Sequence, residues 1–306
     1  MKQKTNFSFL AIGKTQESSE ATESFKRYVG VGSSKVLAVN PTKNELDEIM
    51  GFESANEPEY TKEEDGVKIA SIHFVVQTDP ETNNGIDVKN RLMFTLRNAP
   101  AYNRDQTKVQ VIDNYGNYTW ANVEEAKAGK KLLSAEGKEL KIDTKYRIAY
   151  TGECDLVAFL KAYLCVADVF NYVNGSWVKK DNAEDYIFGL EDIKKYFEGD
   201  FSELKSAIAL QPNNKVKLLY GVRTTEENKQ YQAIASKGDL ILRNNAGRGA
   251  LAKLEKDLAN AKSSGAYPTT EFRICELQEW TAEPTNLEKS ADDPFASDPS
   301  SDLPWQ

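Results

Sequence analysis

The sequence predicts a β-rich α+β fold that ends in a disordered acidic tail, on three observations. Apolar and polar residues alternate with a period of two in several segments, which is the pattern of half-buried strands. Two segments, 153–164 and 247–263, instead space their apolar residues as a helix does. From Thr281 onward proline, serine and aspartate dominate, so we expect no packed core there.

The N-terminal elements follow from glycines, prolines and charge. We expect a basic flexible arm over 1–24, two short strands around Gly30 and Gly32 within 25–39, a helix over 42–50 that ends at Gly51, and an acidic loop over 53–66.

Three strands are expected next, at 67–77, 91–98 and 107–112. In the second strand, Leu92, Phe94 and Leu96 alternate with Arg91, Met93, Thr95 and Arg97. The apolar set should therefore face the core, and the bases should share the opposite face. The turn-rich link over 98–106 predicts that the second and third strands form a hairpin.

The second half of the chain is expected to mix short strands with helices. The predicted elements are a helix and lysine-rich loop over 121–144, a strand over 145–150, the helix over 153–164, short elements within 168–210, a hairpin of 215–222 with 229–235, a strand over 239–243, the helix over 247–263 and a strand over 270–278.

Composition excludes several classes of protein. The chain has 306 residues, a net charge of -8 and a mean hydropathy of -0.58. No window reaches the roughly 18 apolar residues that span a bilayer, and the first 20 residues make a poor export signal. The three cysteines form no CxxC pair, which fits a reducing compartment. We therefore expect a cytoplasmic protein that does not associate with membranes.

The negative charge is concentrated in two segments. Residues 45–65 carry nine acids against one lysine, and residues 281–306 carry six acids against one lysine. Residues 1–44 carry seven bases against three acids, which leaves the body of the chain close to neutral. A local basic patch can bind a phosphate backbone under these conditions, because salt screens distant charges.

Signals for an enzyme are weak. His73 is the only histidine, and it has no nearby cysteine that would complete a zinc site. Gly13-Lys14-Thr15 lacks the earlier glycine of a phosphate-binding loop, and the glycines around Val31 lack the last glycine of a dinucleotide fingerprint. We therefore predict no catalytic residue, no cofactor and no bound metal.

Bases and aromatic residues, by contrast, are interleaved in two regions. Cations neutralise phosphates, and flat rings stack on the unpaired bases of a single strand. A basic face on an ordinary strand is the alternative explanation. The candidate nucleic-acid contacts are Arg91, Arg97, Tyr102, Arg104, Lys108, Tyr115 and Trp120 in the first region and Arg223, Tyr231 and Arg243 in the second.

The C-terminal tail twice places an aromatic residue after proline and behind acids. An aromatic residue in a disordered tail has no core to enter, so a partner's pocket is its expected destination. The candidate partner-binding residues are Asp292, Asp293, Pro294 and Phe295, then Asp302, Leu303, Pro304 and Trp305. This tip resembles the acidic, aromatic-tipped tails of bacterial single-stranded-DNA-binding proteins and their phage replicative counterparts.

The layout of the chain is also similar to that of the phage replicative single-stranded-DNA-binding proteins. The resemblance implies an arm over 1–24, an OB-fold-type β-barrel core with peripheral helices over 25–280, and a disordered acidic tail over 281–306. It further implies a non-enzymatic protein that coats single-stranded DNA during replication or recombination, with cooperative self-association, and recruits a polymerase, helicase or primase through the tail. Some family members hold zinc through one His and three Cys; here His73, Cys154, Cys165 and Cys275 are too far apart in sequence for that pattern.

Two other functions stay open. A structural or assembly protein of a phage particle would bind protein surfaces through its sheet, and an acidic enzyme with no visible motif is the third possibility. Quenching of intrinsic fluorescence by oligo-dT would separate the first function from both others.

Overall fold

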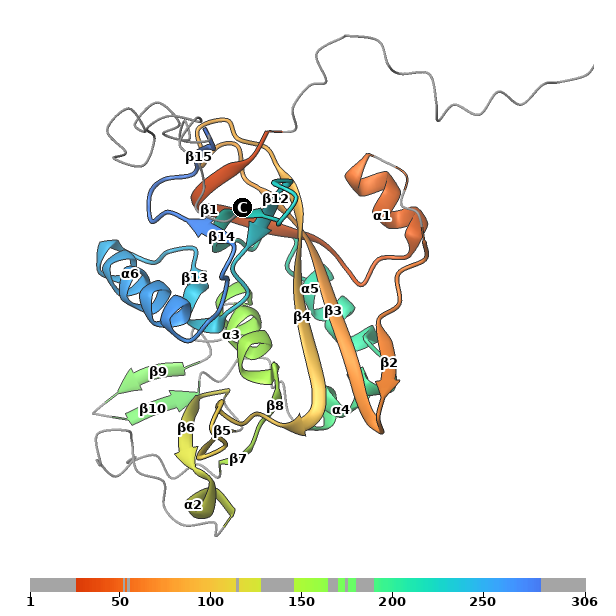
Figure 1. Cartoon of the computed structure of the whole chain (residues 1–306), viewed down its shortest axis with the longest axis vertical. Coiled ribbons are helices and arrows are strands. Elements are labelled where there is room, and N and C mark those ends of the chain that lie inside the picture. The colour runs from red at the N-terminus through yellow and green to blue at the C-terminus, as the bar shows by residue number, and fades with distance from the viewer. Residues whose placement is uncertain are drawn as a thin grey trace, which may run out of the picture.

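A curled antiparallel sheet forms the body of the computed structural model, which describes residues 26–51, 53, 56–113, 116–127, 146–164, 170–173, 176–179 and 190–281 (Figure 1). Within those residues the sheet has ten strands, and its main path runs β12-β11-β1-β3-β4-β8. The strands of this path are β1 (Tyr28–Val39), β3 (Val67–Thr78), β4 (Lys89–Pro100), β8 (Tyr150–Thr151), β11 (Val216–Thr224) and β12 (Gln230–Ile234).

The chain order of this path is a Greek key. Strands β1, β3 and β4 follow one another as antiparallel neighbours, and β11 returns after a long connection to pair with β1. Strand β12 then comes into contact with β4 without a hydrogen-bonded ladder between them, so the sheet curls into a partly open barrel. The short strands β2 (Thr61–Glu64), β13 (Leu242–Arg243), β14 (Thr270–Phe272) and β15 (Gln278–Glu279) extend its edges.

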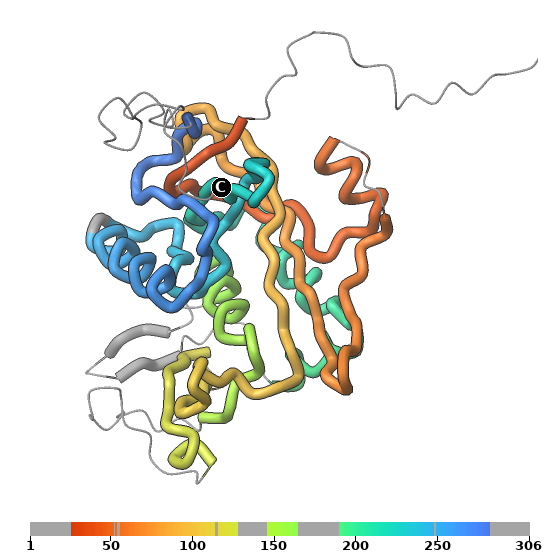
Figure 2. The backbone as a smooth tube through the Cα atoms, in the orientation of Figure 1, coloured from red at the N-terminus to blue at the C-terminus, as the bar shows by residue number. Residues whose placement is uncertain are grey.

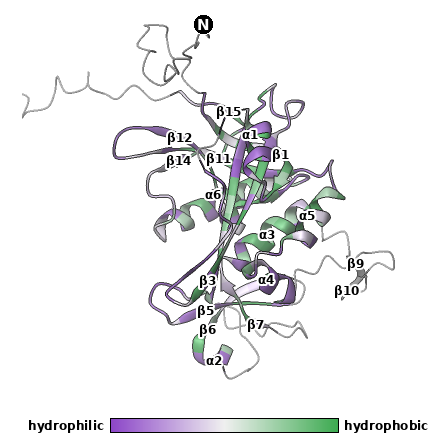
Figure 3. Cartoon of the chain, turned by 90° about the vertical axis from the view of Figure 1, so that its right-hand side faces the viewer, coloured by the Kyte–Doolittle hydropathy of each residue, from purple (hydrophilic) through white to green (hydrophobic). Residues whose placement is uncertain are grey.

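Helices cover the two faces of the sheet unequally. Helices α3 (Glu153–Tyr163), α4 (Leu190–Phe197) and α5 (Ser202–Ala209) lie on one side, and α6 (Arg248–Ser263) lies on the other (Figure 3). Helix α1 (Lys43–Met50) stands apart from both groups, beyond β3 (Figure 1). Long β3 and β4 run side by side through the middle of the molecule (Figure 2).

The main core lies between the inner face of the sheet and α3. Phe159 of α3 is fully buried, and its ring centroid lies 4.6 Å from that of Phe74 and 5.4 Å from that of Phe94. The helical spacing of apolar residues over 153–164 is therefore confirmed. A second, smaller core packs α6 against the opposite face of β11, with Leu254 and Leu258 buried against Leu219.

Two smaller sheets lie outside the main one. Strands β5 (Lys108–Ile112), β6 (Tyr118–Asn122) and β7 (Arg147–Ile148) form the first, and the short helix α2 (Val123–Lys127) lies between β6 and β7 along the chain. Strands β9 (Phe170–Val173) and β10 (Ser176–Lys179) form the second. The first sheet is joined to the body through Tyr118, which packs on α3 and reaches the 3-10 helix η2 (Gly238–Leu240).

Two strand predictions were wrong. Residues 25–39 do not break at their glycines: β1 is one strand, because Gly30 adopts a φ of +121° that only glycine tolerates and so keeps the strand paired. A Cβ at Gly30 would also lie 2.6 Å from the Glu276 carbonyl oxygen. The expected hairpin of 91–98 with 107–112 does not form, since β4 pairs with β3 and β8 whereas β5 pairs with β6 and β7.

Other boundaries agree with the sequence or refine it. The helices over 42–50 and 247–263 and the hairpin β11–β12 are confirmed. The acidic loop over 53–66 contains strand β2, and the strands expected over 145–150 and 270–278 are each divided into two short ones. The arm over 1–24 and the tail from residue 282 lie outside the described residues.

Candidate nucleic-acid interface

The outer face of β4 carries the exposed residues that the alternation predicts. Leu92, Phe94 and Leu96 are buried at 3% exposure or less, whereas Arg91, Met93, Thr95 and Arg97 are exposed. Met93 is half exposed although it is a large apolar side chain. Sequence reasoning placed Met93 on this face but did not count it among the contacts; its position between two arginines was the available signal.

Strand β3 places the imidazole ring of His73 beside Met93. His73 lies directly opposite Met93 in the β3–β4 ladder, so the two side chains share the outer face. The ring of Tyr60 meets His73 edge-on at 5.1 Å between centroids, and the Tyr60 hydroxyl donates to the carbonyl oxygen of Pro41 at 2.5 Å. The carboxamide oxygen of Asn40 accepts a hydrogen bond from the His73 backbone. These contacts fix the imidazole in place.

The imidazole of His73 is held in its neutral form. Burial, together with a smaller effect of the nearby Arg91 guanidinium, lowers the pKa of His73 to about 4. Burial also raises the pKa of Tyr60 to about 12. Neither ring therefore carries charge near neutral pH.

The two arginines of β4 differ in their ion pairing. Within the described part of the chain, the Arg91 guanidinium has no ion-pair partner. Arg97 lies 4.0 Å from the Glu64 carboxylate of β2, which itself pairs with Lys62 at 2.6 Å. An exposed pair at that separation contributes little, so both guanidinium groups are open to an incoming anion.

The β11–β12 hairpin presents a second cation and ring. Arg223 pairs directly with Tyr231, and both side chains are exposed, Tyr231 by half. Arg223 also has no ion-pair partner among the described residues. The predicted Arg223 and Tyr231 are therefore brought together.

The strand register joins these two groups on one outer face. Lys217 of β11 pairs with Ser33 of β1, and Lys35, two residues along β1, pairs with Gln77 of β3. Residues two apart on a strand point to the same side. The outer side of β11 is therefore the outer side of β3 and β4, although the two groups are remote in sequence.

The small sheet separates two residues that the sequence placed in one groove. Trp120 lies opposite Gln110 and shares its face with Lys108, two residues along β5. Tyr102 forms a bridge with Val109, whose side chain points to the other face. Tyr102 and Trp120 are each 40% exposed, but on opposite sides of this sheet.

The remaining candidates lie in other places. Arg104 is exposed in the loop before β5. Arg243 pairs with Val216, a core residue, so it is half-buried on the inner side of the sheet. Tyr115 and the tail residues 292–295 and 302–305 lie outside the described residues.

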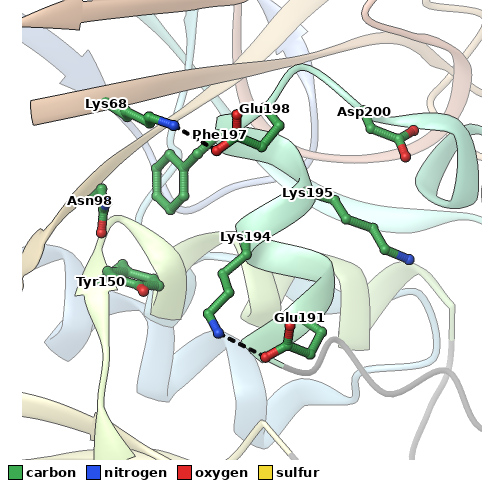
Figure 4. Close-up of a pocket in the computed structure, with 9 residues that line it drawn as sticks. All are labelled: Lys68, Asn98, Tyr150, Glu191, Lys194, Lys195, Phe197, Glu198 and Asp200. Carbon is green, nitrogen blue, oxygen red and sulfur yellow. Dashed lines mark hydrogen bonds and ion pairs between the residues drawn. The ribbon is translucent and has the colours of Figure 1, made fainter.

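A shallow pocket of about 390 Å³ lies at the far end of β4, next to α4 (Figure 4). The rings of Tyr150 and Phe197 meet edge-on at 5.3 Å. Its three lysines are already paired with glutamates, Lys68 with Glu198, Lys194 with Glu191 and Lys195 with Glu203. This pairing leaves no unbalanced charge for a ligand.

The described residues hold no other kind of candidate site. No cluster of three or more metal-ligating side chains occurs among the described residues, where Cys154 and Cys275 are free thiols and burial raises the pKa of both. No helix in the described segments has the length and apolar composition to cross a membrane. Comparisons with protein-family models, curated proteins and solved structures found no match.

Proposed function

We propose that this protein binds and coats single-stranded DNA without strong sequence preference during replication or recombination. One observation carries the proposal. Among the described residues, the large exposed apolar side chains are Met93, Tyr102, Trp120, Tyr231 and Leu210, and three of them share a face with a candidate cation: Met93 with Arg91, Trp120 with Lys108 and Tyr231 with Arg223. Exposed apolar groups next to unpaired cations are what an unpaired strand needs, since phosphates require charge and bases require flat apolar contacts.

The topology supports an OB-type barrel as the scaffold. The five main strands are, in chain order, β1, β3, β4, β11 and β12. In the sheet they lie in the order fifth, fourth, first, second, third, and α3 comes between the third and the fourth along the chain. In this assignment β3 and β4 are the second and third strands. Oligonucleotides bind OB-folds on the outer face of that strand pair and on its neighbouring loops. Arg91, Met93 and Arg97 occupy that face.

The proposed selectivity is physical. A duplex stacks its bases on one another and hides their faces, so the rings of this surface have nothing to contact. A single strand exposes both bases and phosphates, and each stacked base contributes about 1–3 kcal/mol. Neutralised phosphates release counterions, so affinity should fall with salt at a log–log slope near -0.7 for each contact.

The acidic tail completes the proposal. Its six acids would compete with DNA for the basic face when DNA is absent, and Phe295 and Trp305 would recruit replication enzymes once DNA displaces the tail. Deletion of residues 285–306 should then tighten DNA binding and abolish recruitment.

The test is an equilibrium titration of fluorescein-labelled oligo-dT, followed by polarisation, with a duplex of the same length as the control. We expect saturable binding to the single strand and much weaker binding to the duplex. Absence of oligo-dT binding, or equal affinity for both nucleic acids, would overturn the proposal. Large closed oligomers on gel filtration with no DNA binding would favour a structural or assembly protein instead.

A further inference from the structure

Met93 and His73 form a neutral patch between the cations of the outer face. Met93 is half exposed at the centre of a twelve-residue strand. The ring nitrogens of His73 have no hydrogen-bond partner among the described residues, although much of the ring is shielded from solvent. Arg91 lies two residues before Met93 on β4 and points to the same face. The main core lies on the opposite side of β4, so core packing does not account for the positions of Met93 and Arg91.

The chemistry of the patch matches a nucleobase. A methionine side chain adapts its shape to a flat ring, and its sulfur interacts favourably with aromatic systems. A neutral imidazole offers one N–H donor and one acceptor nitrogen, which can meet the polar edge of a base. A phosphate would find neither feature useful, so the patch differs in kind from the arginines beside it.

We propose that Met93 and His73 form the base-contacting subsite of the outer face, in which a base lies on Met93 with its edge toward the imidazole and Arg91 holds a neighbouring phosphate. This inference rests on the proposed function. The subsite is preorganised, because Tyr60 holds the His73 ring edge-on and Asn40 holds its backbone. Little conformational freedom is therefore lost when a base binds.

The experiment compares oligo-dT with an abasic oligonucleotide of equal length, which keeps the phosphates and lacks the bases. Met93→Ala should weaken binding of oligo-dT at least about fivefold, the lower end for a stacked base, and leave abasic binding unchanged. Arg91→Ala should weaken binding of both. Leu210→Ala removes another exposed apolar side chain, at the end of α5 on the α3 side of the sheet, and should change neither affinity.

A second measurement does not depend on a variant. His73 is the only histidine, so the Hε1 proton of its imidazole gives an NMR resonance that needs no assignment between residues. Oligo-dT should shift that resonance, and the abasic oligonucleotide should leave it in place.

The outcomes separate the two proposals. Two outcomes refute the subsite while the proposed function stands, provided that oligo-dT binds the wild type. In the first, Met93→Ala weakens the binding of both oligonucleotides equally. In the second, oligo-dT does not shift the histidine resonance. If the wild-type protein does not bind oligo-dT at all, both are refuted.

Discussion

The dependence of oligo-dT affinity on salt concentration reports how many phosphates the outer face neutralises. Arg91 has no ion-pair partner among the described residues, and Arg97 has only an exposed carboxylate at 4.0 Å, so each can neutralise one phosphate. The double variant Arg91→Ala/Arg97→Ala should therefore reduce the log–log salt slope of oligo-dT binding by about 1.4. Between 50 and 200 mM salt, that difference makes the ratio of wild-type to variant affinity shrink about sevenfold.

The assay is the polarisation titration repeated at four or five salt concentrations. The matched control is Lys194→Ala/Lys195→Ala, which also removes two positive charges. Those lysines are paired with Glu191 at 2.8 Å and Glu203 at 2.6 Å, away from the outer face. The log–log salt slope of this control variant should therefore equal that of the wild type. A slope for the arginine variant that matches the wild type would refute the assignment of these two residues to phosphates.

Three further predictions concern packing, register and protonation. Phe159→Ala should lower the free energy of unfolding by about 3–5 kcal/mol in urea titrations, because its ring is fully buried against Phe74; a loss below about 1 kcal/mol would contradict that packing. Trp120→Ala and Tyr102→Ala should affect oligo-dT affinity additively, since the residues lie on opposite faces; a coupling above about 0.5 kcal/mol would show that they share one groove. His73 has a folded-state pKa of about 4, below its unfolded value of 6.5, so the unfolded chain binds more protons between these pH values. Stability should rise with pH across that window, and an NMR midpoint near 6.5 would contradict the burial of the ring.

The spacing of apolar residues along the sequence was enough to predict several elements of the fold. The alternation over 91–97 assigned Leu92 and Phe94 to the core and Arg91 to the surface, because successive side chains of a strand must point to opposite sides. Helix α3 followed in the same way from its 3.6-residue period. These predictions succeeded because each depends only on residues a few positions apart.

Pairing between distant segments was decided by the tertiary structure. Nothing near Tyr231 in the sequence says that it shares a face with Met93; the register through β1 does. The same holds for Tyr102 and Trp120, which the sequence grouped and the β5 ladder separates. The sequence by itself determined which side chains are apolar, charged or aromatic and which way they alternate. Only the folded chain decided which of them meet, because strand pairing depends on backbone hydrogen bonds and on packing against helices far away along the chain.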